Sequence, residues 1–377
     1  NITIINTCAV TSEAIKKAKK AVRRSYRLNP KKKIVVTGCA AQIEPTTFSS
    51  MNEVDFVIGN EEKLSSDTWT NLNNKTPKEN MLSKINVKDI MNVKKIHPWQ
   101  ISKLAKRSRA YVQIQNGCDH RCTFCVIPFG RGNSRSISVE KVVLQVRKLV
   151  ENGFNEIVLT GVDLTSWGND LIARPKLGFL VKEILSKVPG LPRLRLSSID
   201  SVEIDAQLID IIINEKRFMP HLHLSLQSGD NMILKRMKRR HSREEAIEFC
   251  QSIRLRRPEI TFGADIIVGF PTETQVMFKN SVDLIHECNL TWLHVFPFSA
   301  RSGTPASKMP PVSVKEIKKR ASELRSLRQS RVTEYLDSVI GKKMSVLVEG
   351  NGKGRTETFA EVIVDPSLEA GVITDLT

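Results

Sequence analysis

Short apolar runs alternate with amphipathic segments along most of the chain. Three runs near the start are strand-length and rich in β-branched residues: residues 2–5, 34–37 and 54–58. Between the first two, residues 12–29 have the spacing of a basic helix, with Thr11 or Ser12 as its N-cap. A strand, a helix and a second strand in this order predict a βαβ unit with parallel strands. Residues 70–100, rich in Asn and Lys with little periodicity, are typical of a surface linker.

From about residue 109 a second rhythm begins, in which helical patterns such as 138–153 and 242–257 separate six strand-length runs. The runs are residues 110–115, 156–161, 194–198, 222–227, 262–269 and 292–298. This alternation predicts a parallel layer or an incomplete (β/α)6 barrel. Glycine and polar residues follow each run, and the active sites of parallel barrels lie at that carboxyl end. Any one cluster could be an ordinary turn, but six in succession favour a site there.

The C-terminal part has a different pattern. Residues 313–336 predict a basic amphipathic helix, and residues 342–365 predict two strands around a glycine-rich turn. We therefore expect an α/β protein with four segments. They are an N-terminal α/β (Rossmann-like) domain at 1–70, a linker at 71–104, the partial barrel with its following helix at 105–337, and a small β-barrel module at 338–377.

Lys and Arg outnumber Asp and Glu by 58 to 40, a formal net charge of +18. A solubilising excess is the ordinary explanation, but clustering in segments 16–33, 235–240 and 315–331 favours a polyanionic partner. Long basic helices can also be simply solvated faces. No apolar run is long enough to span a membrane, and no signal peptide opens the chain. Seven cysteines, an odd number, argue against a secreted disulfide scaffold and favour a reducing cytoplasm.

Three cysteines are packed into the stretch "GCDHRCTFC": Cys118, Cys122 and Cys125. Zinc would need a fourth ligand, for which His120 and His221 are available. Three thiolates on one short loop also suit three irons of a [4Fe-4S] cluster, with the fourth iron open to an exogenous ligand.

Two other cysteines, Cys8 and Cys39, each come directly after a predicted strand. A strand-end cysteine is more often a small buried hydrophobe, but two at matching positions favour metal ligands. Cys250 and Cys288 lie inside helical patterns and are expected to pack in the core.

The spacing CxxxCxxC, with Phe124 before Cys125, resembles the radical S-adenosylmethionine (SAM) superfamily. With "NTCAVT", "GCAAQ" and "GCDHRCTFCVIPFGRGNSRS", nearly the whole chain resembles the methylthiotransferases. The resemblance implies that Cys118, Cys122 and Cys125 hold the radical cluster. A second [4Fe-4S] cluster would need three N-terminal cysteines, of which Cys8 and Cys39 are present. The chain begins within a strand pattern and without Met, so we expect the third upstream of Asn1.

Within that family, "PFGRGNSRS", "GVDLTSWG", "RLRLSSIDSVEID" and "LHLSLQSGD" are most similar to the branch that acts on N6-threonylcarbamoyladenosine in tRNA. A branch acting on isopentenyladenosine in tRNA is next, and a third modifies an aspartate of a ribosomal protein. The resemblance implies SAM contacts from the six residues Phe124, Gly161, Asp163, Ser198, Gln227 and Asp265. The residues alone place polar groups at strand ends without assigning individual contacts.

The terminal module resembles the TRAM domain, which binds RNA. Its own charge from residue 338 onward is four basic against six acidic residues, so the main electrostatic anchor should lie elsewhere. The expected RNA contacts are Lys235, Arg236, Arg239, Lys353 and Arg355. Expected partners are the tRNA anticodon loop, an electron donor such as flavodoxin or ferredoxin, and a sulfur donor. A non-enzymatic RNA-binding protein with structural zinc remains the distant alternative, and the net charge of +18 disfavours a modifier of basic ribosomal proteins.

Overall fold

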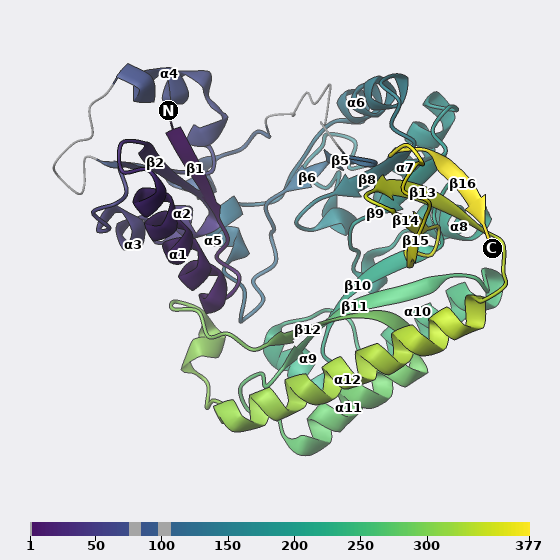
Figure 1. Ribbon diagram of the computed structural model, residues 1–377. Coiled ribbons are helices and arrows are strands. Elements are labelled where there is room, and N and C mark those ends of the chain that lie inside the picture. Colours follow the sequence, from purple (N-terminus) through teal and green to yellow (C-terminus); the bar gives the residue numbers. More distant parts are fainter. Residues whose placement is uncertain (1, 75–83, 97–106) are drawn as a thin grey trace. The chain divides into compact units, whose positions relative to one another are not determined.

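A computed structural model describes residues 2–74, 84–96 and 107–377. The chain forms two compact units, which are not continuous in sequence (Figure 1). The cysteine unit comprises residues 1–97, 116–135 and 299–308, and the barrel unit comprises 98–115, 136–298 and 309–377. The loop after the first predicted barrel strand therefore packs with the N-terminal segment.

The cysteine unit is built on a four-stranded parallel sheet in the order β1-β2-β3-β4, which confirms the βαβ pattern. The Thr11 hydroxyl accepts a hydrogen bond from the Ala14 N–H and caps α1. Ile15, Ala18 and Val22 form the buried face of α1, as the helical spacing requires. The elements are β1 Ile2–Thr7, α1 Ser12–Leu28, β2 Lys33–Gly38, α2 Cys39–Ile43, α3 Pro45–Ser49, β3 Phe56–Ile58, η1 Glu62–Leu64, α4 Ser66–Asn74, β4 Ile85–Asn86, η3 Ile90–Asn92, α5 Ile127–Arg131 and η6 Pro305–Lys308.

The segment expected as a linker contains part of this sheet. Ile85–Asn86 forms β4 and pairs with β3 in parallel register. Residues 75–83 and 97–106, which the same expectation covers, lie outside the described residues.

The barrel unit contains two three-stranded parallel sheets, in the orders β5-β8-β9 and β10-β11-β12. A parallel bridge between Ile199 and Leu224 links their neighbouring edges, and no closed barrel is detected in the described part of the chain. The expected partial barrel is confirmed in this form. The elements are β5 Ala110–Gln113, α6 Val139–Glu151, β8 Glu156–Thr160, η4 Leu164–Ser166, α7 Leu177–Lys187, β9 Arg193–Leu196, η5 Ser201–Glu203, α8 Ala206–Asn214, β10 His221–Gln227, α9 Asn231–Met237, α10 Arg243–Arg256, β11 Thr261–Val268, α11 Gln275–Glu287 and β12 Leu290–Pro297. The short strands β6 Gln115–Asn116 and β7 Arg135–Ser136 stand where the chain passes between the units.

Strand period places different chemistry on the two faces of these sheets. In β10, Leu222, Leu224 and Leu226 are buried on one face, while His221 and His223 alternate with them on the other. This alternation gives the strand one apolar face and one polar face, and the polar face is the one that can carry a site.

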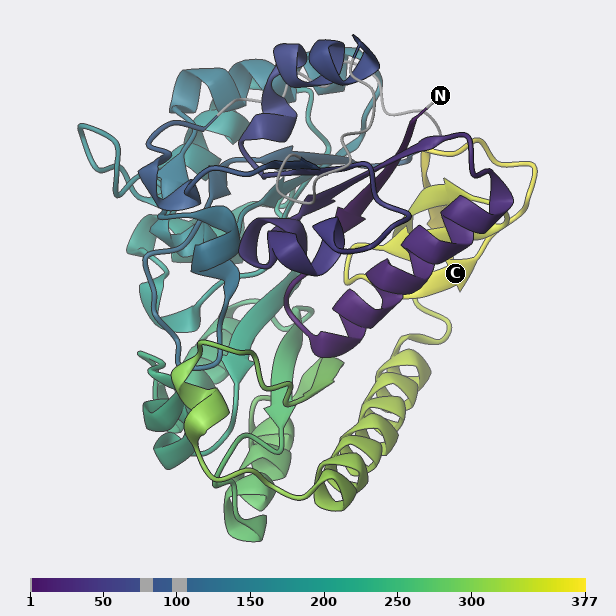
Figure 2. The same ribbon diagram turned by 90° about the vertical axis from the view of Figure 1, so that its left-hand side faces the viewer.

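A long helix, α12 Val314–Val339, leads from the strands to the C-terminal module (Figure 2). The module is a four-stranded antiparallel sheet in the order β15-β14-β13-β16. Asn351 and Gly352 both have positive φ, as the tight turn of a hairpin requires. The strands are β13 Met344–Gly350, β14 Lys353–Thr356, β15 Glu361–Ile363 and β16 Ile373–Leu376. Among the described residues, none of the helices combines the length and apolar character needed to cross a bilayer.

Candidate functional site

The loop with Cys118, Cys122 and Cys125 follows β6 and runs into α5, within the cysteine unit. The Cys118 N–H donates to the Gly132 carbonyl oxygen at 3.1 Å, and the Cys125 N–H donates to the Cys122 carbonyl oxygen at 3.0 Å. Gly117 has φ +78°, and a Cβ there would lie 1.9 Å from a backbone carbonyl oxygen, so this turn needs glycine. All three cysteines are reduced thiols and are partly exposed. Such a donor set fits a [4Fe-4S] cluster.

Cys8 and Cys39 lie at the carboxyl ends of adjacent parallel strands, as the sequence indicated. Thr7 of β1 is the register partner of Gly38 of β2, and each cysteine is the next residue. Cys8 is exposed and Cys39 is buried, and both are free thiols. Their placement at one edge of the sheet fits two ligands of a common cluster.

Polar groups surround the Cys39 sulfur, and sequence reasoning did not single them out. The Arg131 Nε–H donates to Cys39 Sγ at 3.0 Å, and Asn60 Nδ2 lies 3.8 Å from the same sulfur. Asn60 Nδ2 also donates to the Gly130 carbonyl oxygen at 2.6 Å, and its Oδ1 accepts from Lys63 Nζ at 2.7 Å. The signal was present in the stretch "PFGRG", but nothing local connects that stretch with Cys39, which lies 92 residues earlier.

Of the six residues expected to contact SAM, five lie in the barrel unit and one lies on the cysteine loop. Gly161 and Asp163 follow β8, Ser198 follows β9 and Gln227 ends β10. The structure thus places these four at the carboxyl ends of neighbouring strands, and it places Asp265 inside β11. Phe124 precedes Cys125 in the cysteine unit.

Gln115 fixes the turn after β8, a role that the sequence did not reveal. Its Oε1 accepts hydrogen bonds from the Val162 and Asp163 N–H groups, both at 2.9 Å. A Cβ on Gly161 would lie 2.9 Å from that oxygen, so glycine permits the close approach. The Ser166 hydroxyl donates to Asp163 Oδ2 at 2.7 Å and orients the carboxylate.

Asp265 accepts hydrogen bonds from two histidines on the adjoining strands. His223 Nε2 lies 2.8 Å and His294 Nδ1 lies 3.1 Å from Asp265 Oδ1, and the two rings are 4.6 Å apart. Burial by itself raises the pKa of Asp265, but the two hydrogen bonds outweigh it and lower the pKa to about 2. Asp265 is therefore a carboxylate at neutral pH. The register of the strands could have revealed this group of side chains, because Asp265 of β11 is paired with His294 of β12.

The amino ends of the strands are closed by a buried charge cluster. Glu156, the first residue of β8, is fully buried and lies 2.8 Å from Arg109 Nε and 3.0 Å from Arg195 Nε. Arg193 is 3.7 Å away, and Arg109 also pairs with Glu349 of the C-terminal module at 2.6 Å. Burial lowers the pKa of Arg195 to about 10, although Glu156 opposes the shift. The Arg195 guanidinium therefore remains charged at neutral pH, and the side chains form one network of ion pairs.

Phe359 of the module lies against this cluster. The His221 ring stacks on it with centroids 4.8 Å apart, and the Arg195 guanidinium lies 5.2 Å from its centroid. Arg195 also donates to the Glu357 and Thr356 carbonyl oxygens at 2.8 and 2.9 Å. His221, one of the two histidines considered for zinc, therefore contributes to the surface that contacts the module.

Two of the three basic residues expected on or just after α9 have protein partners. Arg239 donates to Asp200 Oδ2 at 2.7 Å and Arg236 donates to the Thr272 hydroxyl at 2.8 Å. Lys235 lies in the last turn of the helix.

The two basic residues expected in the module are also paired. Lys353 Nζ lies 2.9 Å from Glu361, and Arg355 lies 3.0 Å from Glu361 and 3.2 Å from Glu349. The Arg355 guanidinium also covers the Phe359 ring at 4.7 Å.

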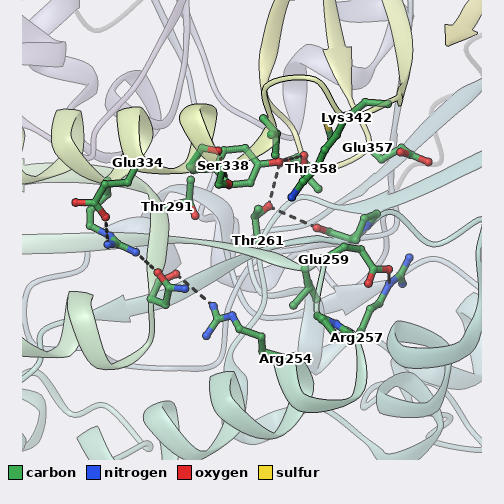
Figure 3. A pocket seen from close by; sticks show the side chains of 18 of the residues that line it. Arg254, Arg257, Glu259, Thr261, Thr291, Glu334, Ser338, Lys342, Glu357 and Thr358 are labelled. Atoms are coloured by element: carbon green, nitrogen blue, oxygen red, sulfur yellow. Dashed lines mark hydrogen bonds and ion pairs between the residues drawn. The ribbon is translucent and has the colours of Figure 1, made fainter. Parts of the chain in front are cut away.

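A crevice of about 750 Å³ opens beside the module (Figure 3). Figure 3 shows Arg254, Arg257 and Lys342 around it. Its lining contains six basic residues, Lys216, Arg254, Arg257, Arg331, Lys342 and Lys343, and three acidic ones, Glu259, Glu334 and Glu357. Lys216 and Lys342 form no ion pair within the described residues.

The comparisons with known proteins agree with this arrangement. Residues 112–285 match the model of the radical SAM superfamily, and residues 1–59 match the model described as uncharacterized protein family UPF0004. The chain is 50% identical to the threonylcarbamoyladenosine tRNA methylthiotransferase MtaB of Rickettsia prowazekii, over 99% of this chain and 86% of that protein. It is 36% identical to the protein of the same name from Aquifex aeolicus, over 98% and 89%.

The chain belongs to the radical SAM methylthiotransferases. It is more similar to these two MtaB proteins than to the tRNA-2-methylthio-N(6)-dimethylallyladenosine synthase of Ehrlichia chaffeensis, which is 32% identical over 94% of this chain and 80% of that protein. This confirms the family and branch that the sequence motifs resembled. It decides against the non-enzymatic zinc protein.

Among solved structures, the radical SAM methyltransferase TsrM of Kitasatospora setae, with cobalamin and a [4Fe-4S] cluster bound, has a TM-score of 0.58 and 15% identity. The similarity covers 80% of this chain and 64% of that one. At this identity the similarity shows the fold alone and nothing about activity or substrate. Family membership implies SAM and a [4Fe-4S] cluster, for which the loop of Cys118, Cys122 and Cys125 supplies the fitting donors.

Proposed function

We propose that this protein adds a methylthio group to carbon 2 of N6-threonylcarbamoyladenosine next to the anticodon of tRNA. The main support for this substrate is the 50% identity with the Rickettsia prowazekii MtaB protein over nearly the whole chain. The match to the radical SAM superfamily supports the type of chemistry. We expect the reaction in the cytoplasm, where the tRNA is.

In this proposal Cys118, Cys122 and Cys125 hold the radical cluster. When bound, the cluster and SAM supply the radical that removes hydrogen from carbon 2. The protein contributes the tied loop, which presents three thiolates together, and the polar turn at Asp163, which Gln115 holds in place. Asp265, kept ionised by its two histidine donors, provides a fixed acceptor for hydroxyl groups of a bound ligand.

Cys8 and Cys39 would hold a second, auxiliary cluster with one further cysteine. Their positions after adjacent parallel strands support this. A sulfur donor must replenish the sulfur that is transferred, and an electron donor such as flavodoxin or ferredoxin must reduce the radical cluster.

For the tRNA, the crevice beside the module supports a contact with phosphates. Six of its lining residues are basic, and the part of the chain that the structure describes offers no ion pair to Lys216 or Lys342. By contrast, Arg239, Lys353 and Arg355 are already paired with carboxylates, so their RNA contacts would need those pairs to open. The target base must also leave its stack to reach the site.

Nucleoside mass spectrometry of tRNA tests the proposal. In cells that lack the gene, the methylthio form of threonylcarbamoyladenosine should disappear, and it should return on complementation with the wild type. If the methylthio form of isopentenyladenosine is lost instead, the substrate is that of the other tRNA branch. Unchanged tRNA would overturn the proposal and favour a ribosomal-protein substrate.

A further inference from the structure

In the cysteine unit, two helices that lie next to cysteines are in close contact. Helix α5, which begins two residues after Cys125, packs on α2, which begins with Cys39. A Cβ on Gly130 would lie 3.1 Å from Cys39 Cβ and 3.2 Å from Ile43 Cδ1. Glycine is therefore what lets α5 approach closely enough for its last residue, Arg131, to reach the Cys39 sulfur at 3.0 Å.

The surroundings of Cys39 are those of a sulfur that carries negative charge. The Arg131 guanidinium donates to Sγ, Asn60 Nδ2 lies at 3.8 Å, and Lys63 is linked to Asn60 at 2.7 Å. Burial lowers the pKa of Lys63, and the nearby charge of Arg131 lowers it further. Two cations placed this close together in a partly buried site are costly unless an anion lies between them.

We propose that Arg131, supported by Asn60 and Lys63, is a positioning residue that stabilises the Cys39 sulfur as an auxiliary-cluster ligand and raises the reduction potential of that cluster. Hydrogen bonds to cluster sulfurs and nearby charge are the protein's main means of tuning such potentials. Both contributions favour the reduced, more negative state of the cluster. This inference rests on the auxiliary cluster of the proposed function.

The test is a redox titration of the full-length protein, followed by electron paramagnetic resonance. Arg131→Gln should lower the equilibrium constant for reduction of the auxiliary cluster by about tenfold. For one electron this lowers the midpoint potential by about 59 mV. Arg131→Lys keeps the charge and should shift it less. Lys187→Gln, which removes a paired surface charge from α7 of the barrel unit, is the matched control and should leave the potential unchanged.

Two milder variants keep the inference testable if Arg131→Gln does not assemble the cluster. Gly130→Ala should push α5 away from Cys39 without changing any charge, and Lys63→Gln removes the second cation without touching the sulfur. Each should lower the equilibrium constant for reduction of the auxiliary cluster by about threefold, and with it the midpoint potential. An unchanged potential in all assembled variants would overturn the role of Arg131.

Iron content separates this outcome from a failure of the proposed function. Cys39→Ala should lose the iron of one cluster while the radical cluster remains. If Cys39→Ala keeps all its iron, the auxiliary cluster itself is wrong. If it loses iron but the Arg131 variants titrate like the wild type, only the present inference is wrong.

Discussion

At the carboxyl ends of the barrel-unit strands, the chain passes into turns that carry Gly161, Asp163 and Gln227, whereas at the amino ends Glu156 and Phe359 lie among buried arginines. The first set leaves polar groups ready for a ligand, and the second satisfies its charges internally. The same parallel strands therefore separate two tasks. One end can carry chemistry because the other end carries much of the stability and the attachment of the module.

The largest effect is expected in the loop that follows β6. Cys122→Ala removes one of three thiolates and should abolish SAM cleavage, measured as 5′-deoxyadenosine formation, while tRNA binding persists. Cys250→Ala is the control, because Cys250 is fully buried inside α10 and should affect stability but not cleavage. Retained cleavage in the Cys122 variant would contradict the site.

At the opposite end, Glu156→Gln should cost stability. It leaves Arg109, Arg193 and Arg195 without their shared buried carboxylate, and breaking such a network typically costs about 3–5 kcal/mol. Urea unfolding measures the loss. Glu183→Gln, in a partly exposed pair with Lys187, should cost only about 0.3–0.5 kcal/mol, and an equal loss in both variants would contradict the role of Glu156.

The amino end should also be sensitive to acid. Burial, and then the charge of Arg195, hold the pKa of His221 well below 6.5, so the folded protein keeps this ring neutral where the unfolded chain binds a proton. The free energy of unfolding should therefore fall as the pH falls below about 6.5, by at most about 1.4 kcal/mol per pH unit from this group. His221→Gln should flatten that slope in urea titrations between pH 7 and 5. An unaltered slope would contradict the prediction.

The smallest effect is expected in the crevice beside the module. The double change Lys216→Ala and Lys342→Ala should weaken tRNA binding at every salt concentration and reduce the slope of log affinity against log salt by about 2. Filter binding between low and moderate salt measures it. Lys279→Ala with Lys187→Ala is the matched control, since both are exposed and already paired. Equal slopes in the two double variants would remove the crevice from the RNA interface.

Local periodicity was sufficient to predict the longer helices and most of the strands, but it missed β4 inside the expected linker. Thr11 capped α1 as expected, and the six strand-length runs of the barrel unit became β5, β8, β9, β10, β11 and β12. The positions of the cysteines after their strands also followed from the pattern.

What the pattern missed depends on contacts between distant residues. Arg131 and Cys39 are 92 residues apart, and Arg195 is 161 residues from the Thr356 carbonyl that it binds. Basic residues look alike in sequence whether solvated or paired, which is why the ion pair of Arg239 with Asp200 could not be anticipated. The grouping of residues 116–135 with the N-terminal segment is equally non-local.

Within the barrel unit, part of the contact between the parallel strands and the C-terminal module is made with the main chain of the module. Arg195 binds the carbonyl oxygens of Thr356 and Glu357, and Thr261 binds that of Thr358 at 2.9 Å. Main-chain recognition does not depend on which side chains the module displays elsewhere. Substitutions on the outer strands of the module, away from the turn around Phe359, should therefore leave its attachment to the other strands of the barrel unit intact.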